Sequence, residues 1–426
     1  MRSSQSRLDE AVGLARAIDL NVVLADVIPI RSPRPATYIG LGRIDGLRQV
    51  IEDQEVGLLM VDCALSPVQQ RNLEKALSIK VIDRTGLILE IFGRRARTRE
   101  GTLQVELAHL DYQKSRLVRS WTHLERQRGG FGFLGGPGET QIEADRRLIQ
   151  DRMRRIERDL EGVRRTRGLH RASRDKVPFP TVALVGYTNA GKSTLFNRLT
   201  RADVLAKDML FATLDPTTRL VDLPHGKRII LSDTVGFISD LPTMLVAAFR
   251  ATLEDVIEAD VILHVRDIAH EDAEAQSADV TTILTDLGIR ADDPGRIIEV
   301  WNKSDLLGPE ERERRAALTR LGHPGAPSPW LVSAVTGEGI DALLEAIEQR
   351  LTHSHARFSL TIAADDGAGL AWVYEMAEVL SRSSDDAGAA HLVLRVPPER
   401  QGRLERRFGA ALVPMEPGPS VRDGID

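Results

Sequence analysis

The hydrophobic pattern of the first hundred residues alternates between two periods. Apolar runs rich in β-branched residues, at 22–30, 56–65 and 80–92, are typical of strands. Before the third run, PVQQRNLEKAL has helical spacing directly after Ser66, a favourable N-cap residue. This alternation predicts a small α/β domain with a partly parallel sheet over residues 1–100.

The period changes near residue 101, where apolar residues begin to recur at four-three spacing. This spacing holds on both sides of a glycine-rich stretch and predicts two helices of about 27 residues, each about 40 Å long. Together they form an antiparallel coiled-coil hairpin over residues 101–170, with its tip at 128–140. The seam residues are Leu103, Leu107, Leu110, Leu117, Val118, Trp121 and Leu124, then Ile142, Ile149, Met153, Ile156, Leu160 and Val163.

Composition and charge narrow the possible partners. With 42% hydrophobic and 28% charged residues the chain is typical of globular domains, and its net charge of −5 argues against nucleic acid. The charge is segregated, however, because residues 94–174 hold 20 Lys and Arg against 11 Asp and Glu. This distribution indicates a basic module carried by acidic domains.

The hairpin tip contains G-x-G-x-x-G at Gly130, Gly132 and Gly135, the pattern of dinucleotide sites. That function needs a strand before the glycines, whereas the charged WTHLERQR precedes them. Six glycines in 129–138 instead permit close backbone approach to a partner, and the phenylalanines between them could stack on unpaired bases. In the alternative interpretation both rings fold back onto the protein. The candidate RNA contacts are Gly130, Phe131, Gly132, Phe133, Arg146 and Arg147.

Several features are expected to carry no chemistry. Cys63 lies in an apolar run and is expected to be a small buried hydrophobe. His353 and His355 lack the further ligands of a metal site and are expected in an exposed linker. The N-terminus has acidic residues where a signal peptide needs an apolar core, and no run approaches the ~18 apolar residues of a membrane span. We therefore expect a cytoplasmic protein without an integral membrane segment.

A basic, proline-containing linker at 171–180 precedes the most informative motif. GYTNAGKST, at 186–194, follows the apolar strand TVALVG and opens a helical run, which is G-x-x-x-x-G-K-S in its strand–loop–helix context. Backbone N–H groups of such a loop bind phosphates, Lys192 reaches the β and γ oxygens, and the Ser193 hydroxyl is a ligand for Mg²⁺. A nucleoside triphosphatase domain is predicted over residues 181–353.

Two further motifs belong to the γ-phosphate side of this site. RIILSDTVG is a strand ending in D-x-x-G, in which Asp233 would hold the magnesium shell through water and Gly236 would turn toward the γ-phosphate. FATLDPTTR supplies Thr213 as the second magnesium hydroxyl on a switch loop, with Thr217 and Thr218 as rivals. Lys192, Asp233 and Gly236 are the expected catalytic residues.

The base is read by N-K-x-D and SAVTG. Asp305 can accept two hydrogen bonds from guanine, a donor pair that adenine lacks, and the Ala334 N–H can reach the guanine O6. Asn302 would brace the loops and Lys303 would lie across the base. The expected nucleotide contacts are Gly186, Tyr187, Thr188, Asn189, Ala190, Gly191, Lys192, Ser193, Thr194, Phe211, Ala212, Thr213, Leu214, Asp215, Asp233, Thr234, Val235, Gly236, Asn302, Lys303, Ser304, Asp305, Ser333, Ala334 and Val335.

The residue after D-x-x-G is conspicuous. Ras-like enzymes have a glutamine there that orients the attacking water, whereas this chain has Phe237. Because a phenyl ring cannot hydrogen-bond to water, we expect slow intrinsic hydrolysis that a partner accelerates. Residues 354–426 read as strand, helix and strand, a small C-terminal α/β module without a catalytic constellation.

These motifs together resemble the HflX family, ribosome-associated GTPases of the translation-factor-related class and relatives of the Obg proteins. The resemblance runs to the end of the GTPase domain, while the C-terminal seventy residues match only in outline. Phe133 and Leu134 stand where some relatives are expected to present a basic residue. The matching stretches include TYIGLGRIDGL, LSPVQQRNLE, VIDRTGLILEIFGRRARTREGTLQVELA, GGFGFLGGPGETQIE, GYTNAGKSTLFN, FATLDPTTR, DTVGFI, NKSD and SAVTG.

The resemblance implies an α/β multidomain fold: an N-terminal α/β domain with a long antiparallel coiled-coil hairpin, a P-loop GTPase domain with a mostly parallel sheet, and a small α/β C-terminal domain. It implies Mg²⁺-dependent GTP hydrolysis stimulated by the large ribosomal subunit and its rRNA. The protein would be a monomer off the ribosome, and its GTP form would split stalled ribosomes under stress. One alternative is a GTP-regulated binding switch acting in subunit assembly, and another is an RNA-remodelling NTPase that also uses ATP.

Overall fold

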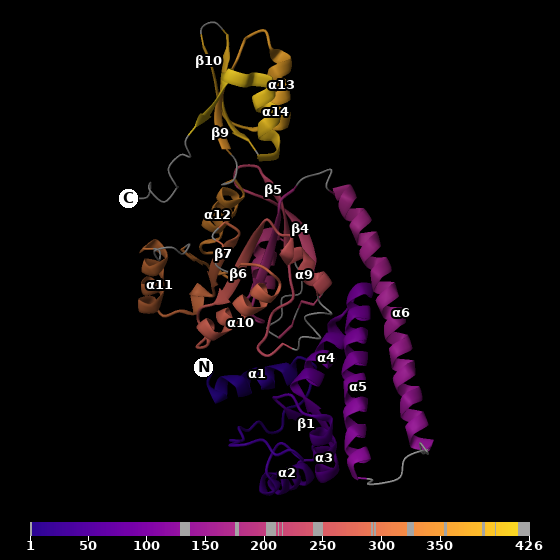
Figure 1. Ribbon diagram of the computed structural model, residues 1–426. Coiled ribbons are helices and arrows are strands. Elements are labelled where there is room, and N and C mark those ends of the chain that lie inside the picture. The colour runs from indigo at the N-terminus through magenta and orange to yellow at the C-terminus, as the bar shows by residue number, and fades with distance from the viewer. Residues whose placement is uncertain are drawn as a thin grey trace. The chain divides into compact units, whose positions relative to one another are not determined.

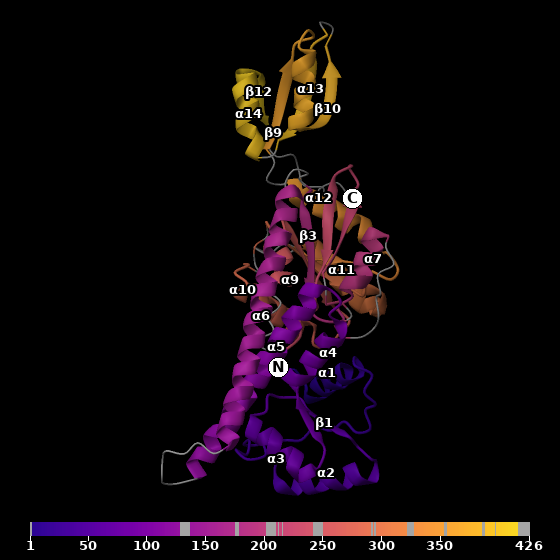
Figure 2. The same cartoon turned by 90° about the vertical axis from the view of Figure 1, so that its right-hand side faces the viewer.

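The computed structural model is described in two units. Unit 1 comprises residues 1–222 and 228–340, and unit 2 comprises 223–227 and 341–426. The structure describes residues 2–127, 137–174, 179–201, 210–211, 213–214, 216–241, 250–290, 293, 295–321, 328–352, 356–385, 388–396 and 398–415. The ribbon is shown from two sides in Figures 1 and 2.

The N-terminal domain is α/β, as predicted, but its sheet is small. Strands β1 (Leu58–Val61) and β2 (Lys80–Asp83) pair in parallel. The helices of this domain are α1 (Ser4–Arg16), α2 (Leu41–Asp53), α3 (Pro67–Leu77) and α4 (Arg84–Arg95), of which α3 and α4 contact the strands. The predicted N-cap is confirmed, because Ser66 and Gln69 form a capping box at the start of α3.

Two of the strand interpretations were wrong. Residues 22–30 form no regular element, and Val23 and Leu24 in that run are about half exposed; Pro29 also lacks the N–H that a sheet ladder needs. Residues 84–92 are helical and not a continuation of the strand. Asp83 ends β2 and caps α4 by accepting a hydrogen bond from the Gly86 N–H at 2.8 Å. A short apolar run has the same composition in a buried strand and in a helix buried on several sides, which explains the error.

The helical hairpin is confirmed and is longer than its spacing predicted. It consists of α5 (Arg99–Gln127) and α6 (Pro137–Arg174), which run side by side in opposite directions (Figures 1 and 2). Helix α6 therefore extends into the stretch expected to be a linker. Val105 and Ala108 of α5 are buried in the cluster that includes Phe92 of α4, so the hairpin is anchored by its base to the N-terminal domain.

The GTPase domain is built on a six-stranded sheet of order β4-β5-β3-β6-β7-β8. All neighbouring pairs are parallel except β4 with β5, which confirms a mostly parallel sheet. The strands are β3 (Thr181–Gly186), β4 (Thr217–Asp222), β5 (Arg228–Asp233), β6 (Val261–Asp267), β7 (Ile297–Asn302) and β8 (Trp330–Leu331). The helices are α7 (Lys192–Thr200), α9 (Arg250–Ile257), α10 (Ala273–Asp286) and α11 (Pro309–Leu321), with a 3-10 turn at Ser304–Leu306.

The C-terminal part is a second small α/β fold. After α12 (Ile340–Thr352), a four-stranded sheet has the order β10-β11-β9-β12, with antiparallel neighbours throughout. The helix of the predicted strand–helix–strand pattern ends at Met376, and a further strand begins at Glu378. The elements are β9 (Ala356–Ile362), α13 (Gly367–Met376), β10 (Glu378–Ser384), β11 (Ala390–Val396), α14 (Pro398–Phe408) and β12 (Leu412–Met415), with a 3-10 turn at Gly409–Ala411 before the last strand.

Two minor expectations can be checked directly. None of the helices in the described residues is long and apolar enough to cross a membrane. Cys63 is only half-buried and its thiol lies beside the Tyr38 hydroxyl; burial and neighbouring carboxylates raise the pKa of the thiol. A thiol with a raised pKa is a poor nucleophile, which agrees with a structural role. His353 and His355 lie outside the described residues.

Candidate functional site

The phosphate-binding motif follows β3, the strand from which the chain continues to β5 on one side of the sheet and then to β6 on the other side. Strand β3 pairs with β5 on one side and β6 on the other, and the loop 187–191 leaves its carboxyl end. Such a point is the usual ligand position in a parallel sheet. Helix α7 starts at Lys192, so its free backbone N–H groups face the same place.

Two glycines make the close packing of this loop possible. Gly191 has φ +89°, and a Cβ there would overlap the Asn302 amide. A Cβ on Gly236 would lie 2.8 Å from Thr188 Cα. Any other residue at either position would push the loops apart, so both glycines are required by sterics.

The Lys192 ammonium is buried beneath the loop. Its Nζ donates to the carbonyl oxygens of Gly186 at 3.1 Å and Tyr187 at 2.8 Å. Burial lowers the pKa of Lys192 to about 8, while the charge of Asp233 acts in the opposite direction. Negative phosphates in the loop would favour the ammonium form further.

Ser193, Thr213 and Asp233 converge from three separate segments. The Ser193 and Thr213 hydroxyl oxygens are 2.8 Å apart, and they donate to Asp233 Oδ2 at 2.7 and 3.0 Å. The two rival hydroxyls, Thr217 and Thr218, instead belong to strand β4. The structure therefore brings together the three groups that the sequence placed around Mg²⁺.

The chemistry of this cluster suits a hard divalent cation. Hydroxyl and carboxylate oxygens are the ligands that Mg²⁺ prefers. Asp233 Oδ1 is buried and receives no hydrogen bond from the described residues. Burial raises the pKa of Asp233, against the hydrogen bond from Ser193 and the charge of Lys192. A cation nearby would relieve both the unpaired oxygen and the cost of burying the charge.

The base-reading loops are joined to each other and to the P-loop. Asn302 Nδ2 donates to the Ala190 carbonyl at 2.9 Å, and its Oδ1 accepts from the Ala334 N–H at 3.0 Å. The Ser333 hydroxyl donates to Asp305 Oδ1 at 2.6 Å. Asn302 thus braces three loops, as predicted, and Ser333 orients the carboxylate expected to read guanine.

Lys303 is held by an acidic partner. Its Nζ lies 2.7 Å from Asp267 Oδ2, at the end of β6. The residue has φ +66°, which turns the chain sharply between Asn302 and the 3-10 turn of Ser304–Leu306. This ion pair fixes the long side chain beside the base-reading loop.

The remaining residues expected to contact the nucleotide include the polar Thr188 and several apolar side chains. The Thr188 hydroxyl accepts from the Phe211 N–H at 2.9 Å, which ties the P-loop to the switch segment. Leu214 and Val235 are buried apolar side chains and contribute to packing. Val335 is mostly exposed. Ala212 and Asp215, and the tip residues Gly130, Phe131, Gly132 and Phe133, lie outside the described residues.

Phe237 is buried in the hydrophobic core with 1% of its surface exposed. Its backbone pairs with the P-loop, accepting from the Thr188 N–H at 2.6 Å and donating to the Gly186 carbonyl at 3.1 Å. The ring therefore serves packing, and its position offers no group that could orient water.

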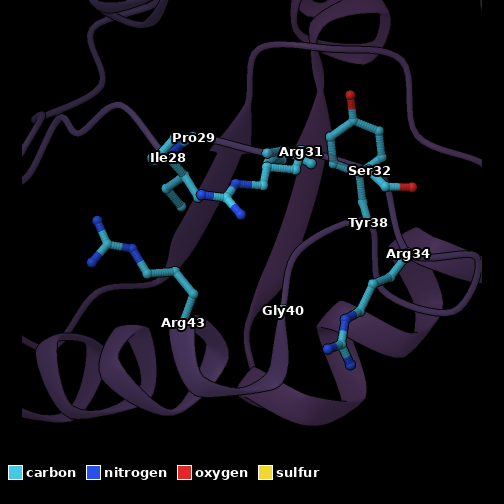
Figure 3. A pocket seen from close by; sticks show the side chains of 9 residues that line it. Ile28, Pro29, Arg31, Ser32, Arg34, Tyr38, Gly40 and Arg43 are labelled. Atoms are coloured by element: carbon cyan, nitrogen blue, oxygen red, sulfur yellow. The ribbon is translucent and has the colours of Figure 1, made fainter.

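A separate hollow of about 600 Å³ lies in the N-terminal domain (Figure 3). Arg43 on its rim is paired with Asp26, and the Arg34 side chain points away from Arg31 and Arg43 (Figure 3). No nucleotide-binding motif of the sequence lies here. Its lining residues are Ile28, Pro29, Ile30, Arg31, Ser32, Arg34, Tyr38, Gly40 and Arg43.

Comparison with known proteins agrees with this arrangement. Residues 5–93 match the model of the GTP-binding GTPase N-terminal region, 95–174 that of the GTPase middle region, 181–303 that of the 50S ribosome-binding GTPases and 326–416 that of the HflX C-terminal domain. A curated GTPase HflX of Magnetococcus marinus is 50% identical over 94% of this chain and 90% of its own length. The chain belongs to the HflX family of GTPases.

The GTPase HflX of Escherichia coli is 45% identical over 86% of this chain and 84% of its own length. GTP binding and hydrolysis are therefore the activity of this HflX chain. Among solved structures, a GTP-binding protein from Sulfolobus solfataricus in complex with GDP is 23% identical, covering 82% of this chain and 97% of that one, with a TM-score of 0.45.

Sequence reasoning missed one group of residues at this HflX site. Glu10 and Arg84 of the N-terminal domain reach Tyr187 of the P-loop and Ser239, three residues beyond Gly236. Neither residue lies in a nucleotide-binding motif, and 155 or more positions separate them from the residues of the GTPase domain that they contact. No pattern along the chain could have indicated these contacts.

Proposed function

We propose that this HflX protein is a Mg²⁺-dependent GTPase that acts in the cytoplasm on the large ribosomal subunit and splits stalled ribosomes under stress. The observation that carries the proposal is the convergence of Ser193, Thr213 and Asp233 beside the P-loop, in a chain that also carries a long basic hairpin. The matching family model for residues 181–303 is named for ribosome binding, which supports this partner.

In this proposal Ser193 and Thr213 hold the cation, with Asp233 as the carboxylate behind them. The bound Mg²⁺ would neutralise charge on the phosphate oxygens. Lys192 and the N–H groups at the start of α7 bind the phosphates, and Gly236 contributes its N–H next to the γ-phosphate. Asp305 selects guanine by accepting two hydrogen bonds, oriented by Ser333.

Because Phe237 is buried and cannot orient water, the attacking water must be oriented by a group from elsewhere. The large ribosomal subunit would supply that group, so that GTP is hydrolysed mainly after binding. The hairpin supplies the contact surface: Arg146 and Arg147 near its tip end are exposed, and Arg147 is 79% exposed. Exposed arginines suit phosphate contacts with rRNA.

The test is GTP turnover by the purified full-length chain, alone and with large ribosomal subunits. Free small subunits and bulk RNA serve as controls. We expect slow turnover alone, and stimulation of at least about 100-fold by large subunits only, as for partner-activated GTPases. Fast turnover by the isolated protein, or equal stimulation by bulk RNA, would overturn the proposal. Sedimentation of whole ribosomes with the protein and a non-hydrolysable GTP analogue then tests splitting.

The burial of Phe237 also favours a second candidate. A protein that hydrolyses GTP poorly can act as a switch whose GTP form binds the ribosome or an assembling subunit, with hydrolysis incidental. Tight, GTP-dependent binding to large subunits without stimulated turnover would favour this switch.

A further inference from the structure

Helices α1 and α4 of the N-terminal domain touch the GTPase site through a buried polar network. Tyr187 Oη donates to Glu10 and accepts from the Ser239 N–H at 2.8 Å. Arg84 donates to the Ser239 carbonyl at 3.0 Å and to its hydroxyl at 2.9 Å, and it pairs with Glu10 at 2.5 Å. One side of this network is therefore the P-loop and the segment after D-x-x-G, and the other side is the N-terminal domain.

The network is built from charges that are matched inside the protein. Arg84 is 4% exposed and also pairs with Asp62, while Arg2 donates to Tyr187 at 2.7 Å and to Glu10 at 3.1 Å. Burial and then the charge of Glu10 raise the pKa of Tyr187, so its hydroxyl stays protonated and donates to the carboxylate. Removing one residue of the network would leave its buried partners without a hydrogen bond, which is costly. A buried network whose members are paired in this way therefore holds these residues in a single geometry.

The same two helices also pack on the switch segment that carries Thr213. The Phe92 ring of α4 meets the Phe211 ring edge-on, with centroids 4.7 Å apart and planes at 83°. A Cβ on Gly13 of α1 would lie 3.1 Å from Leu210, so this helix face and Leu210 are in close contact. Phe211 is 1% exposed and lies two residues before Thr213.

We propose that Glu10, Arg84 and Phe92 are positioning residues for GTP hydrolysis: they hold the segments carrying Thr213 and Gly236 in the arrangement that closes around the γ-phosphate. Thr213 reaches Ser193 and Asp233 while Phe211 packs on α4, and Gly236 lies against the P-loop while Ser239 is fixed by Arg84 and Tyr187. The role rests on the placement of Thr213 and Gly236 in the proposed function above.

Only GTP has a γ-phosphate, so contacts that stabilise the closed segments favour GTP over GDP. The effect must be reciprocal, because both events belong to one thermodynamic cycle. GTP binding strengthens the packing of these segments on α1 and α4, and loss of that packing weakens GTP binding. A merely structural interface would affect GDP and GTP equally. The ratio of the two affinities therefore separates the two roles.

The experiment measures the affinities of the full-length chain for fluorescent GDP and for a fluorescent non-hydrolysable GTP analogue in Mg²⁺, together with single-turnover GTP hydrolysis. The variants are Tyr187→Phe, Phe92→Leu and Arg84→Gln. Tyr374→Phe, an exposed tyrosine of the C-terminal part, and Arg48→Gln, an exposed arginine of α2, are the matched controls.

We expect each of the three variants to lower the preference for the GTP analogue over GDP by about 5- to 30-fold, in the lower part of the range for coupled sites, with GDP affinity nearly unchanged. Single-turnover hydrolysis should fall in parallel, and both controls should match the wild type. An unchanged ratio of the two affinities in Tyr187→Phe and Phe92→Leu would overturn the proposal. An equal loss of affinity for GDP and for the GTP analogue would also overturn it. These two variants decide the matter even if Arg84→Gln fails to fold.

Thr213→Ala in the same assays separates this proposal from the site assignment. Thr213→Ala could weaken binding of the GTP analogue relative to GDP while Tyr187→Phe does not. In that case the assignment of Thr213 to the nucleotide site stands and the positioning role is wrong. If Thr213→Ala changes nothing, the assignment of Thr213 is itself wrong.

Discussion

Asp305 is the residue on which the choice of base depends. One of its carboxylate oxygens is oriented by the Ser333 hydroxyl at 2.6 Å, and the residue lies on the exposed side of the loop, where a base can reach it. Guanine offers two N–H donors to a carboxylate and adenine does not. The discrimination against ATP is thus expected to come from this single side chain.

We expect Asp305→Ala to weaken GTP binding by about 1 to 3 kcal/mol and to remove the preference for GTP over ATP, because the two hydrogen bonds to the base are lost. Asp305→Asn, which presents an amide donor, should favour xanthosine triphosphate, whose carbonyl at C2 accepts it. Competition binding with GTP, ATP and xanthosine triphosphate measures both effects, with Asp286→Ala, at an exposed position of α10, as the control. Unchanged selectivity in Asp305→Ala would show that the base is read elsewhere.

His264 gives a residue-scale prediction about stability. It lies on β6 inside the GTPase sheet, where burial lowers its pKa to about 4; the nearby Glu299 acts to raise the pKa, and the nearby Arg266 and Lys192 act to lower it. Its Nε2 has no hydrogen-bond partner among the described residues. The folded protein therefore holds this imidazole neutral over a pH range in which the unfolded chain protonates it.

As the pH falls from about 6.5 to about 4, the unfolded chain takes up a proton that the folded protein excludes. The stabilisation is fully present above 6.5 and is lost across this window, by up to about 3 kcal/mol. Hydrogen exchange of the β6 amides in urea, at a series of pH values, measures how the free energy of unfolding changes with pH. His264→Gln should flatten this dependence, and His270→Gln, at an exposed position, should not. Equal slopes in wild type and His264→Gln would contradict the prediction.

At the scale of elements, the helical hairpin is both long and rich in exposed arginines, whose ion-pair partners differ. Among the described residues, Arg147 pairs with Glu143 and Arg154 with Asp151, both exposed pairs within α6. Arg152 instead bridges the two helices, lying 2.7 Å from Glu106 of α5. The first two are therefore free to exchange their partners for phosphates, whereas Arg152 also serves the hairpin itself.

Replacing Arg146, Arg147 and Arg154 with Gln should weaken binding to large ribosomal subunits and lower the slope of log affinity against log salt by about 2 to 3, since each phosphate contact contributes just under one. The measurement is subunit binding from 50 to 300 mM KCl. Glu106→Gln is the control for hairpin integrity, because it breaks the pair with Arg152 without removing a positive charge. An unchanged slope would mean that these arginines only face solvent.

Elements also show where pattern reading fails. Asp83, the last residue of β2, accepts from the Gly86 N–H and so turns an apparently continuous strand into helix α4. The hairpin was predicted well because its seam repeats over many turns. Residues 84–92 were not, because the apolar residues Leu87–Leu89, Ile91 and Phe92 are too few and too close together to separate a strand from a helix buried on several sides by their period.

At the scale of the whole molecule, the N-terminal domain and the GTPase domain share one cluster of buried residues. It joins Leu14 and Phe92 to Tyr187, Phe211 and Phe237. Phe237, which stands where Ras-like enzymes have a glutamine, belongs to this shared cluster.

The sequence by itself determined the local chemistry of this protein. The P-loop, D-x-x-G, N-K-x-D and SAVTG motifs are short and contiguous, and their backbone geometry depends on neighbouring residues, so the phosphate and guanine sites and their family could be predicted. Only the tertiary structure decided what lies around them. It brought the Thr213 hydroxyl to Ser193 and Asp233, and it brought Glu10 and Arg84 to Tyr187 and Ser239. Such contacts depend on chain folding over a hundred or more residues, and the pattern of neighbouring residues carries no information about them.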